Sequence, residues 1–178
     1  FLLAHFLLTP EAGAWSRRGR WVKIKKNHHY SNWYLPAQGF IFKNSVTMLV
    51  RFDESVMYQN SNPQNQWDIN KLWGFSDCSS AHHTNSARFG FNWAEGKLRL
   101  WGYTYHQGER SWIELMTLKL NETYKTELII DGEQYLFLIN DVIVGTQPRG
   151  CSGMCGIKYR LGPYFGGDET SPQDMAIY

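Results

Sequence analysis

The segment Ser86-Ala-Arg-Phe-Gly-Phe-Asn-Trp-Ala-Glu-Gly-Lys-Leu-Arg-Leu-Trp-Gly-Tyr-Thr-Tyr105 decides the fold. Apolar and polar side chains alternate in both of its halves, which is the period of a half-buried β-strand. Between the halves stands Glu95-Gly96, whose glycine suits a tight turn. We therefore predict an antiparallel β-hairpin over residues 86–105.

The register of this hairpin follows from its side chains, because a shift of one residue would move every side chain to the opposite face of the sheet. A two-residue turn pairs Phe91 with Leu100, which sets apolar against apolar on one face. The same register sets Arg88 opposite Tyr103 on the other face. This polar face then carries Ser86, Arg88, Asn92, Arg99, Trp101, Tyr103 and Tyr105.

Further stretches have the same period of two, and short turn sequences separate them. The predicted strands are 45–52, 86–93, 97–105, 126–130, 135–139 and 142–144, with long loops at 58–68 and 76–85. Many strands joined by short hairpins, with no internal repeat, are typical of a sandwich. The chain is therefore predicted to be all-β, with residues 15–178 forming a single antiparallel β-sandwich of the jelly-roll type behind an apolar arm at 1–14.

The composition fits one globular domain of 178 residues with an unusual share of aromatic side chains, 16%. Flat aromatic faces are the surfaces on which sugar rings stack, although aromatic residues also favour strands in general. A net charge of +2 gives no support to nucleic-acid binding. Any polyanionic partner would need a local basic site.

The N-terminal stretch Phe1-Leu-Leu-Ala-His-Phe-Leu-Leu8 is strongly apolar and similar to the tail of a signal peptide. It is too short for a membrane span. Two arrangements remain open: a strand on its own sheet, or an arm donated to a neighbouring subunit in a homo-oligomer. Together with the cysteines, this stretch predicts a secreted, extracellular protein without a membrane partner.

The three cysteines, Cys78, Cys151 and Cys155, allow one disulfide and leave its pairing open. No Cys-x-x-Cys pair is present, so no metal site is predicted at the cysteines. A structural calcium ion is left open, with oxygen ligands from residues that are more often simple turn residues. These residues are Asp77, Asp168, Glu169 and Asp174.

The polar face of the hairpin is a candidate site, because a solvated face normally carries Lys, Glu, Thr and Ser rather than Arg beside Tyr and Trp. The alternative is a second packed layer, covered by a loop, in which Arg stacks on aromatic rings. His82 and His83 end the preceding loop, where an imidazole can act as a base. Solvated loop histidines are the alternative there, and also for His28 and His29.

Four short motifs follow one another in the second half of the chain: Lys71-Leu-Trp-Gly-Phe75, Ser86-Ala-Arg88, Tyr103-Thr-Tyr105 and Tyr164-Phe-Gly-Gly167. In order and spacing they resemble the alginate and glucuronan lyases of polysaccharide lyase families 14 and 20. The resemblance implies a concanavalin A-like jelly roll that binds and cleaves an acidic polysaccharide. The cleft positions that it implies are Lys71, Ser86, Arg88, Tyr103 and Tyr105.

Such lyases break uronate polymers by β-elimination, in which a base removes the C5 proton and an acid protonates the departing O4. The neighbouring carboxylate must be neutralised first, and the guanidinium of Arg88 suits it. Tyr103 is the predicted base and acid, provided that Arg88 or Lys71 lowers its pKa. No cofactor is required. Tyr105 and Ser86 would support the reaction, and substrate binding is predicted for Trp101, Arg99, Asn92, His82 and His83.

Two other functions remain open from the sequence. A carbohydrate-binding module or lectin would keep the aromatic face without a tuned tyrosine. A structural subunit would use the apolar arm for assembly. A glycoside hydrolase is disfavoured, because it needs two facing carboxylates and this face carries none.

Overall fold

The computed structural model describes residues 21–31, 43–152 and 158–178, and the predicted arm at 1–14 lies outside these ranges. The strands are β1 (Val22–Ile24), β2 (Ser45–Arg51), β3 (Asn70–Ser76), β4 (Ser86–Ala94), β5 (Lys97–His106), β6 (Glu109–Leu118), β7 (Thr123–Asp131), β8 (Gln134–Ile139), β9 (Val142–Pro148), β10 (Arg160–Leu161) and β11 (Met175–Ile177). Two short 3-10 helices precede β3, namely η1 (Glu54–Val56) and η2 (Pro63–Trp67).

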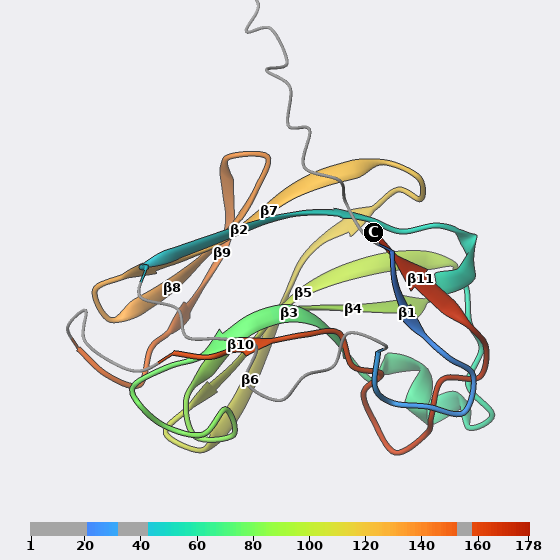
Figure 1. Ribbon diagram of the computed structural model, residues 1–178, viewed down its shortest axis with the longest axis horizontal. Coiled ribbons are helices and arrows are strands. Elements are labelled where there is room, and N and C mark those ends of the chain that lie inside the picture. Colours follow the sequence, from blue (N-terminus) through green and yellow to red (C-terminus); the bar gives the residue numbers. More distant parts are fainter. Residues whose placement is uncertain (1–20, 32–42, 153–157) are drawn as a thin grey trace, which may run out of the picture.

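The strands form two stacked antiparallel sheets (Figure 1). One sheet has the order β10-β3-β4-β5-β6 and the other the order β2-β7-β8-β9. A small ribbon of β1 and β11 lies beside them. The predicted all-β antiparallel sandwich is confirmed.

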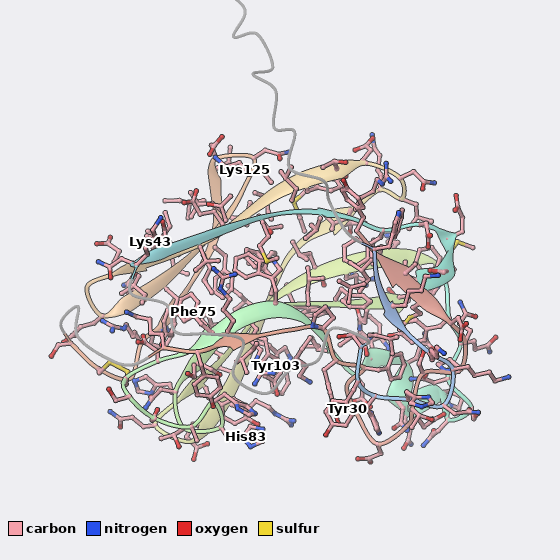
Figure 2. The ribbon with its side chains drawn as sticks, viewed as in Figure 1. Tyr30, Lys43, Phe75, His83, Tyr103 and Lys125 are labelled. Carbon is pink, nitrogen blue, oxygen red and sulfur yellow. A yellow bond between two sulfur atoms is a disulfide. The ribbon has the colours of Figure 1, made fainter. Side chains whose placement is uncertain are left out.

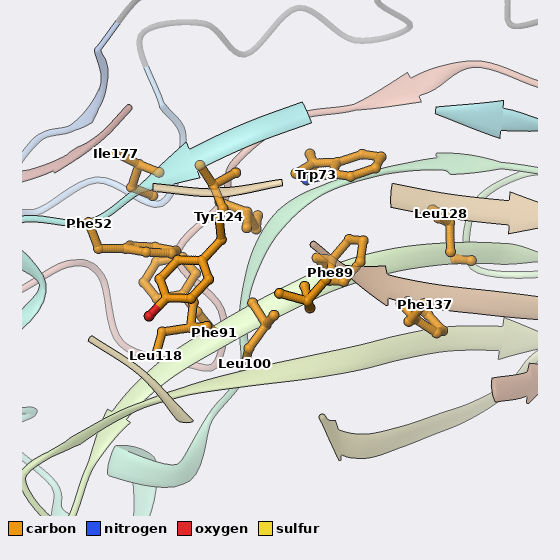
Figure 3. Packing of buried hydrophobic residues seen from close by; sticks show 14 of the residues in the cluster. Phe52, Trp73, Phe89, Phe91, Leu100, Leu118, Tyr124, Leu128, Phe137 and Ile177 are labelled. Atoms are coloured by element: carbon orange, nitrogen blue, oxygen red, sulfur yellow. The ribbon is translucent and has the colours of Figure 1, made fainter. Parts of the chain in front are cut away.

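The core fills the space between the two sheets (Figure 3). Phe89, Phe91 and Leu100 contribute from β4 and β5, and Leu128 and Phe137 from the opposite sheet, all of them fully buried. Fully burying one such side chain contributes about 1.5–3 kcal/mol. Because the apolar face of the hairpin is used here, its polar face must point away from the sandwich.

The hairpin at β4 and β5 has the predicted register. Phe91 faces Leu100 and Arg88 faces Tyr103. Both turn residues have positive φ, 53° at Glu95 and 69° at Gly96, which matches the twist that two-residue hairpin turns require.

Five of the strands were not predicted: β1, β3, β6, β10 and β11. β3 contains the first motif, which was not predicted as a strand, and β1, β10 and β11 are only two or three residues long. β6 is a long edge strand, and its outward residues include both Arg110 and Trp112, which hides its alternation. The two predicted loops are present, although the first contains η2.

A disulfide joins Cys78 to Cys151, which resolves the open pairing, and Cys155 lies outside the described residues. Within the described residues, no helix is long and apolar enough to cross a membrane.

Candidate functional site

The outer face of the β3–β6 sheet collects most of the predicted site residues. Residues that face each other on neighbouring antiparallel strands point to the same side, so register defines rows across the sheet. The first row contains Tyr30, Tyr164, Lys71, Gly90, Trp101 and Glu114. The second contains Gly74, Arg88, Tyr103 and Trp112, and the third Ser76, Ser86, Tyr105 and Arg110.

Figure 2 shows Tyr103, Tyr30 and His83 on one side of the molecule. Lys125, on the other sheet, lies on the opposite side. The face thus combines tyrosines, histidines and cations from segments far apart in the sequence.

Arg88 lies across β3 because Gly74 leaves room for it. A Cβ at Gly74 would stand 2.8 Å from Cγ of Arg88 and 2.1 Å from the carbonyl oxygen of Ala87. The side chain of Arg88 is held against the sheet and is only 7% exposed. Tyr103, its partner on β5, is 4% exposed. The predicted pairing of Arg88 with Tyr103 is confirmed. Both side chains were expected to be accessible, and both are buried.

Lys71 sits directly over the ring of Tyr103. Its Nζ lies 4.6 Å from the ring centroid and donates a 2.7 Å hydrogen bond to the carbonyl of Ile69. A Cβ at Gly166 would stand 2.8 Å from this Nζ, so the glycine of the fourth motif makes room for the amine. Burial, together with the charges of Arg88 and Arg110, lowers the pKa of Lys71 to about 8.

The pKa of Tyr103 is shifted in the direction opposite to the predicted one. Burial raises its pKa to about 12, with a further contribution from Tyr105, whose ring centroid lies 5.9 Å away. Arg110 acts in the lowering direction without outweighing burial. We predicted that neighbouring cations lower the pKa of Tyr103 toward neutral pH. That prediction was wrong, because the cost of desolvating the phenolate outweighs the effect of the cations.

His82 and His83 belong to the loop between β3 and β4. The backbone N–H of His82 donates to the hydroxyl of Tyr159, and its Nδ1 shares a 2.9 Å hydrogen bond with the same hydroxyl. Burial, then the charges of Arg88 and His83, lower the pKa of His82 to about 4, so its ring is neutral at pH 7. His83 is exposed, with its ring centroid 5.3 Å from that of Tyr105.

Ser86 stabilises this loop rather than the exposed face. Its side chain is fully buried, and its Oγ donates a 2.6 Å hydrogen bond to the carbonyl of His82. The loop is anchored at its base by a buried ion pair between Asp77 and Arg149, 2.6 Å from Oδ2 to Nε. The adjacent disulfide at Cys78 ties the same end of the loop to the chain after β9.

The far end of the predicted site is a packed layer, as the alternative reading proposed. Asn92 is fully buried, and its Oδ1 accepts a 2.9 Å hydrogen bond from the indole of Trp101. Trp101 is 9% exposed and packs against Ile69. Neither residue offers a surface to a sugar ring, which corrects their predicted role in substrate binding.

Arg99 is committed to contacts within the protein. Its guanidinium forms ion pairs with Glu95 and Glu114, the latter at 2.8 Å, and stacks 5.0 Å from the ring centroid of Trp67. The predicted substrate contact of Arg99 is therefore corrected as well. These carboxylates neutralise the guanidinium, which leaves it little attraction for an anion.

Several residues at the exposed end were missed. Arg110 is exposed, and Trp112 is 47% exposed. On the other flank, Tyr30 is 52% exposed and meets Tyr164 edge-to-face, while His29 stacks on Tyr164 at 5.2 Å. No clear alternation marks this strand in the sequence, because its outward positions hold both the cation Arg110 and the aromatic Trp112.

Three of the four carboxylates considered for calcium have other partners. Asp77 is bound to Arg149, the carboxylate of Glu169 accepts from the N–H groups of Ser61 and Asn62, and that of Asp174 accepts from the N–H of Lys26. Among the described residues, no three of the four predicted ligands approach one another closely enough to share an ion. Asp77 does lie near Cys78 and Cys151, but those sulfurs are joined in the disulfide and hold no thiolate for a metal.

No family model and no curated protein matches this chain. Solved structures do resemble it. The alginate lyase from Klebsiella pneumoniae is 13% identical, with a TM-score of 0.53 over 75% of this chain and 55% of that one. The alginate lyase AlyC3 is 10% identical, with a TM-score of 0.61 over 88% and 70%. The marine PL7 alginate lyase AlyA1 from Zobellia galactanivorans is 15% identical, with a TM-score of 0.51 over 75% and 57%.

At these identities the likeness concerns the fold. The chain shares the antiparallel jelly roll of alginate lyases, as the sequence motifs implied, and it spans little more than half of the Klebsiella and Zobellia structures.

Proposed function

We propose that this protein cleaves a uronic-acid polysaccharide by β-elimination on the outer face of the β3–β6 sheet. The observation that carries the proposal is the stack of Lys71 over Tyr103, with Arg88 directly opposite Tyr103 on β4. Cations packed against a phenol on rigid strands suit a substrate whose carboxylate must be neutralised before C5 can lose its proton. The fold shared with alginate lyases, and the likeness of the motifs to families 14 and 20, support the same substrate class.

The role that suits Tyr103 is the acid. With a pKa raised to about 12 by burial, its hydroxyl keeps its proton at neutral pH. In the elimination, a base takes the C5 proton, a double bond forms between C4 and C5, and the C4–O4 bond breaks. The phenol of Tyr103 then donates its proton to the departing O4.

The base that we assign is His83, which lies in the β3–β4 loop next to Tyr105 of the third row. His83 and Tyr105 lie with ring centroids 5.3 Å apart, and both are more accessible than Tyr103. A ring nitrogen of an imidazole can accept a proton in general base catalysis. Lys71 and Arg88 supply the positive field beneath the substrate, and no cofactor takes part in the step.

Carbohydrate binding without cleavage is the second candidate. The observation that favours it is the burial of Tyr103 and Trp101, which makes the middle of this face a packed layer. The exposed side chains lie along the β5–β6 rim, at Arg110 and Trp112. A binding module needs only that rim. We also propose an extracellular location, since the Cys78–Cys151 disulfide suits an oxidising compartment.

Incubation with a panel of acidic polysaccharides tests the proposal, with the absorbance of unsaturated uronate ends as the readout. Alginate, glucuronan and their carboxyl-reduced forms make up the panel. Growth of this absorbance with an acidic polymer, and none with its reduced form, is expected. New reducing ends without unsaturation would indicate hydrolysis, and binding without new ends would favour the binding module.

A further inference from the structure

We propose that Arg110 on β6 is the residue that receives the carboxylate of the sugar unit, and that the substrate therefore occupies the β5–β6 rim of the face. This inference rests on the proposed function. The sequence motifs gave the carboxylate-binding role to Arg88. It assigns a substrate contact to a residue outside those motifs.

The register of β6 brings Arg110 to the reactive end of the face. Arg110 is the direct partner of Tyr105, and Trp112 is the direct partner of Tyr103. The guanidinium carbon of Arg110 lies 5.1 Å from the ring centroid of Trp112. It is also close enough to Tyr103 to lower the pKa of that phenol in part. A carboxylate held by Arg110 would thus lie beside both tyrosines.

The other arginines of the site region are less able to take an anion. Arg88 is on β4 and its side chain lies across β3, over Gly74, which is away from the β5–β6 rim. Arg99 is neutralised by Glu95 and Glu114. Arg110 is exposed, and within the described residues no carboxylate forms an ion pair with it.

An exposed arginine is most often simply solvated, but the stack on Trp112 distinguishes this one. Stacking holds the planar guanidinium in one orientation, so less side-chain entropy is lost when two of its N–H groups bind a carboxylate. Trp112 itself is 47% exposed and offers apolar surface beside the cation. An acidic group next to a sugar ring matches this pairing of charge and flat apolar surface.

The substrate that fits is a carboxylated sugar polymer rather than a neutral one. A neutral sugar could contact Trp112, but it would leave the guanidinium without an anionic partner. The selectivity for uronate over its carboxyl-reduced counterpart is therefore assigned to Arg110.

Calorimetric titration with alginate oligosaccharides and with their carboxyl-reduced counterparts tests this assignment in the full chain. Arg110→Ala should weaken binding of the acidic oligosaccharides roughly 10- to 100-fold, the usual effect of losing a charge-assisted hydrogen-bonded pair. Binding of the reduced counterparts should not change. Arg110→Lys should lie between, because it keeps the charge and loses the planar fork.

Lys125→Ala is the matched control, since it removes one positive charge on the opposite sheet (Figure 2). It should leave both affinities unchanged, and circular dichroism checks that all variants are folded. Unchanged affinity of Arg110→Ala for the acidic oligosaccharides, or equal loss for acidic and reduced ones, would overturn the assignment. If the wild type cleaves alginate while Arg110→Ala binds it normally, only the role of Arg110 fails. If the wild type neither binds nor cleaves any acidic polymer, the proposed function fails with it.

Discussion

Replacing Asp77 by alanine should destabilise the protein by about 3–5 kcal/mol, the usual cost of removing one partner of a buried ion pair. The side chains of Asp77 and Arg149 are both 0% exposed. Oδ2 of Asp77 accepts from Nε of Arg149 at 2.6 Å and from the hydroxyl of Tyr135 at 3.0 Å, and Oδ1 accepts from Nη2 at 3.3 Å. The substitution would leave a guanidinium and a phenol in the interior without this acceptor.

Urea denaturation with the disulfide intact measures the effect as a change in the free energy of unfolding. At about 2–4 °C per kcal/mol for a domain of this size, the melting temperature should fall by roughly 6–20 °C. Asp141→Ala is the control, because its ion pair with Lys125 is largely exposed and should contribute only about 0–1 kcal/mol. A loss below about 1 kcal/mol for Asp77→Ala would refute the reasoning that this pair anchors the loop of His82 and His83.

Three further predictions concern the disulfide, His82 and Lys71. Replacing Cys78 and Cys151 by serine should lower stability by on the order of 4 kcal/mol, since the bond closes 73 residues of chain, and denaturation with and without reductant measures it. Stability should fall as the pH drops from about 6.5 to about 4, because the unfolded chain protonates His82 there and the folded chain does not; in His82→Gln this slope should diminish. Between about pH 8 and 10.5 the unfolded chain holds the proton of Lys71 that the folded chain has lost, so stability should rise with pH in that window, and Lys71→Met should remove the rise.

The hairpin at the centre of the site could be predicted because its information is local. The turn at Glu95-Gly96 and the alternation on either side determine which side chains face each other, and Arg88 meets Tyr103 as expected. The fold class followed in the same way from repeated alternation and short turns. The motif Tyr164-Phe-Gly-Gly167 also joins the site, because Tyr164 pairs with Lys71 at the sheet edge.

What could not be predicted depends on contacts between distant parts of the chain. The partner of Asp77 is 72 residues away, so a turn carboxylate could not be distinguished from half of a buried ion pair. The pKa of Tyr103 depends on how deeply it is covered, and the segment around Ile69 that covers Trp101 and Tyr103 comes from outside the hairpin. Arg110 reaches the site through the pairing of an edge strand that the sequence did not reveal.

The most direct test of the central claim compares the wild type with Tyr103→Phe on a polymer that the wild type cleaves. If Tyr103 donates the proton to O4, loss of its hydroxyl should reduce the formation of unsaturated uronate ends by roughly 100-fold or more, while the affinity for the polymer changes little. Full turnover in Tyr103→Phe would contradict the assignment of the acid. Products that carry saturated ends in the wild type would contradict elimination itself.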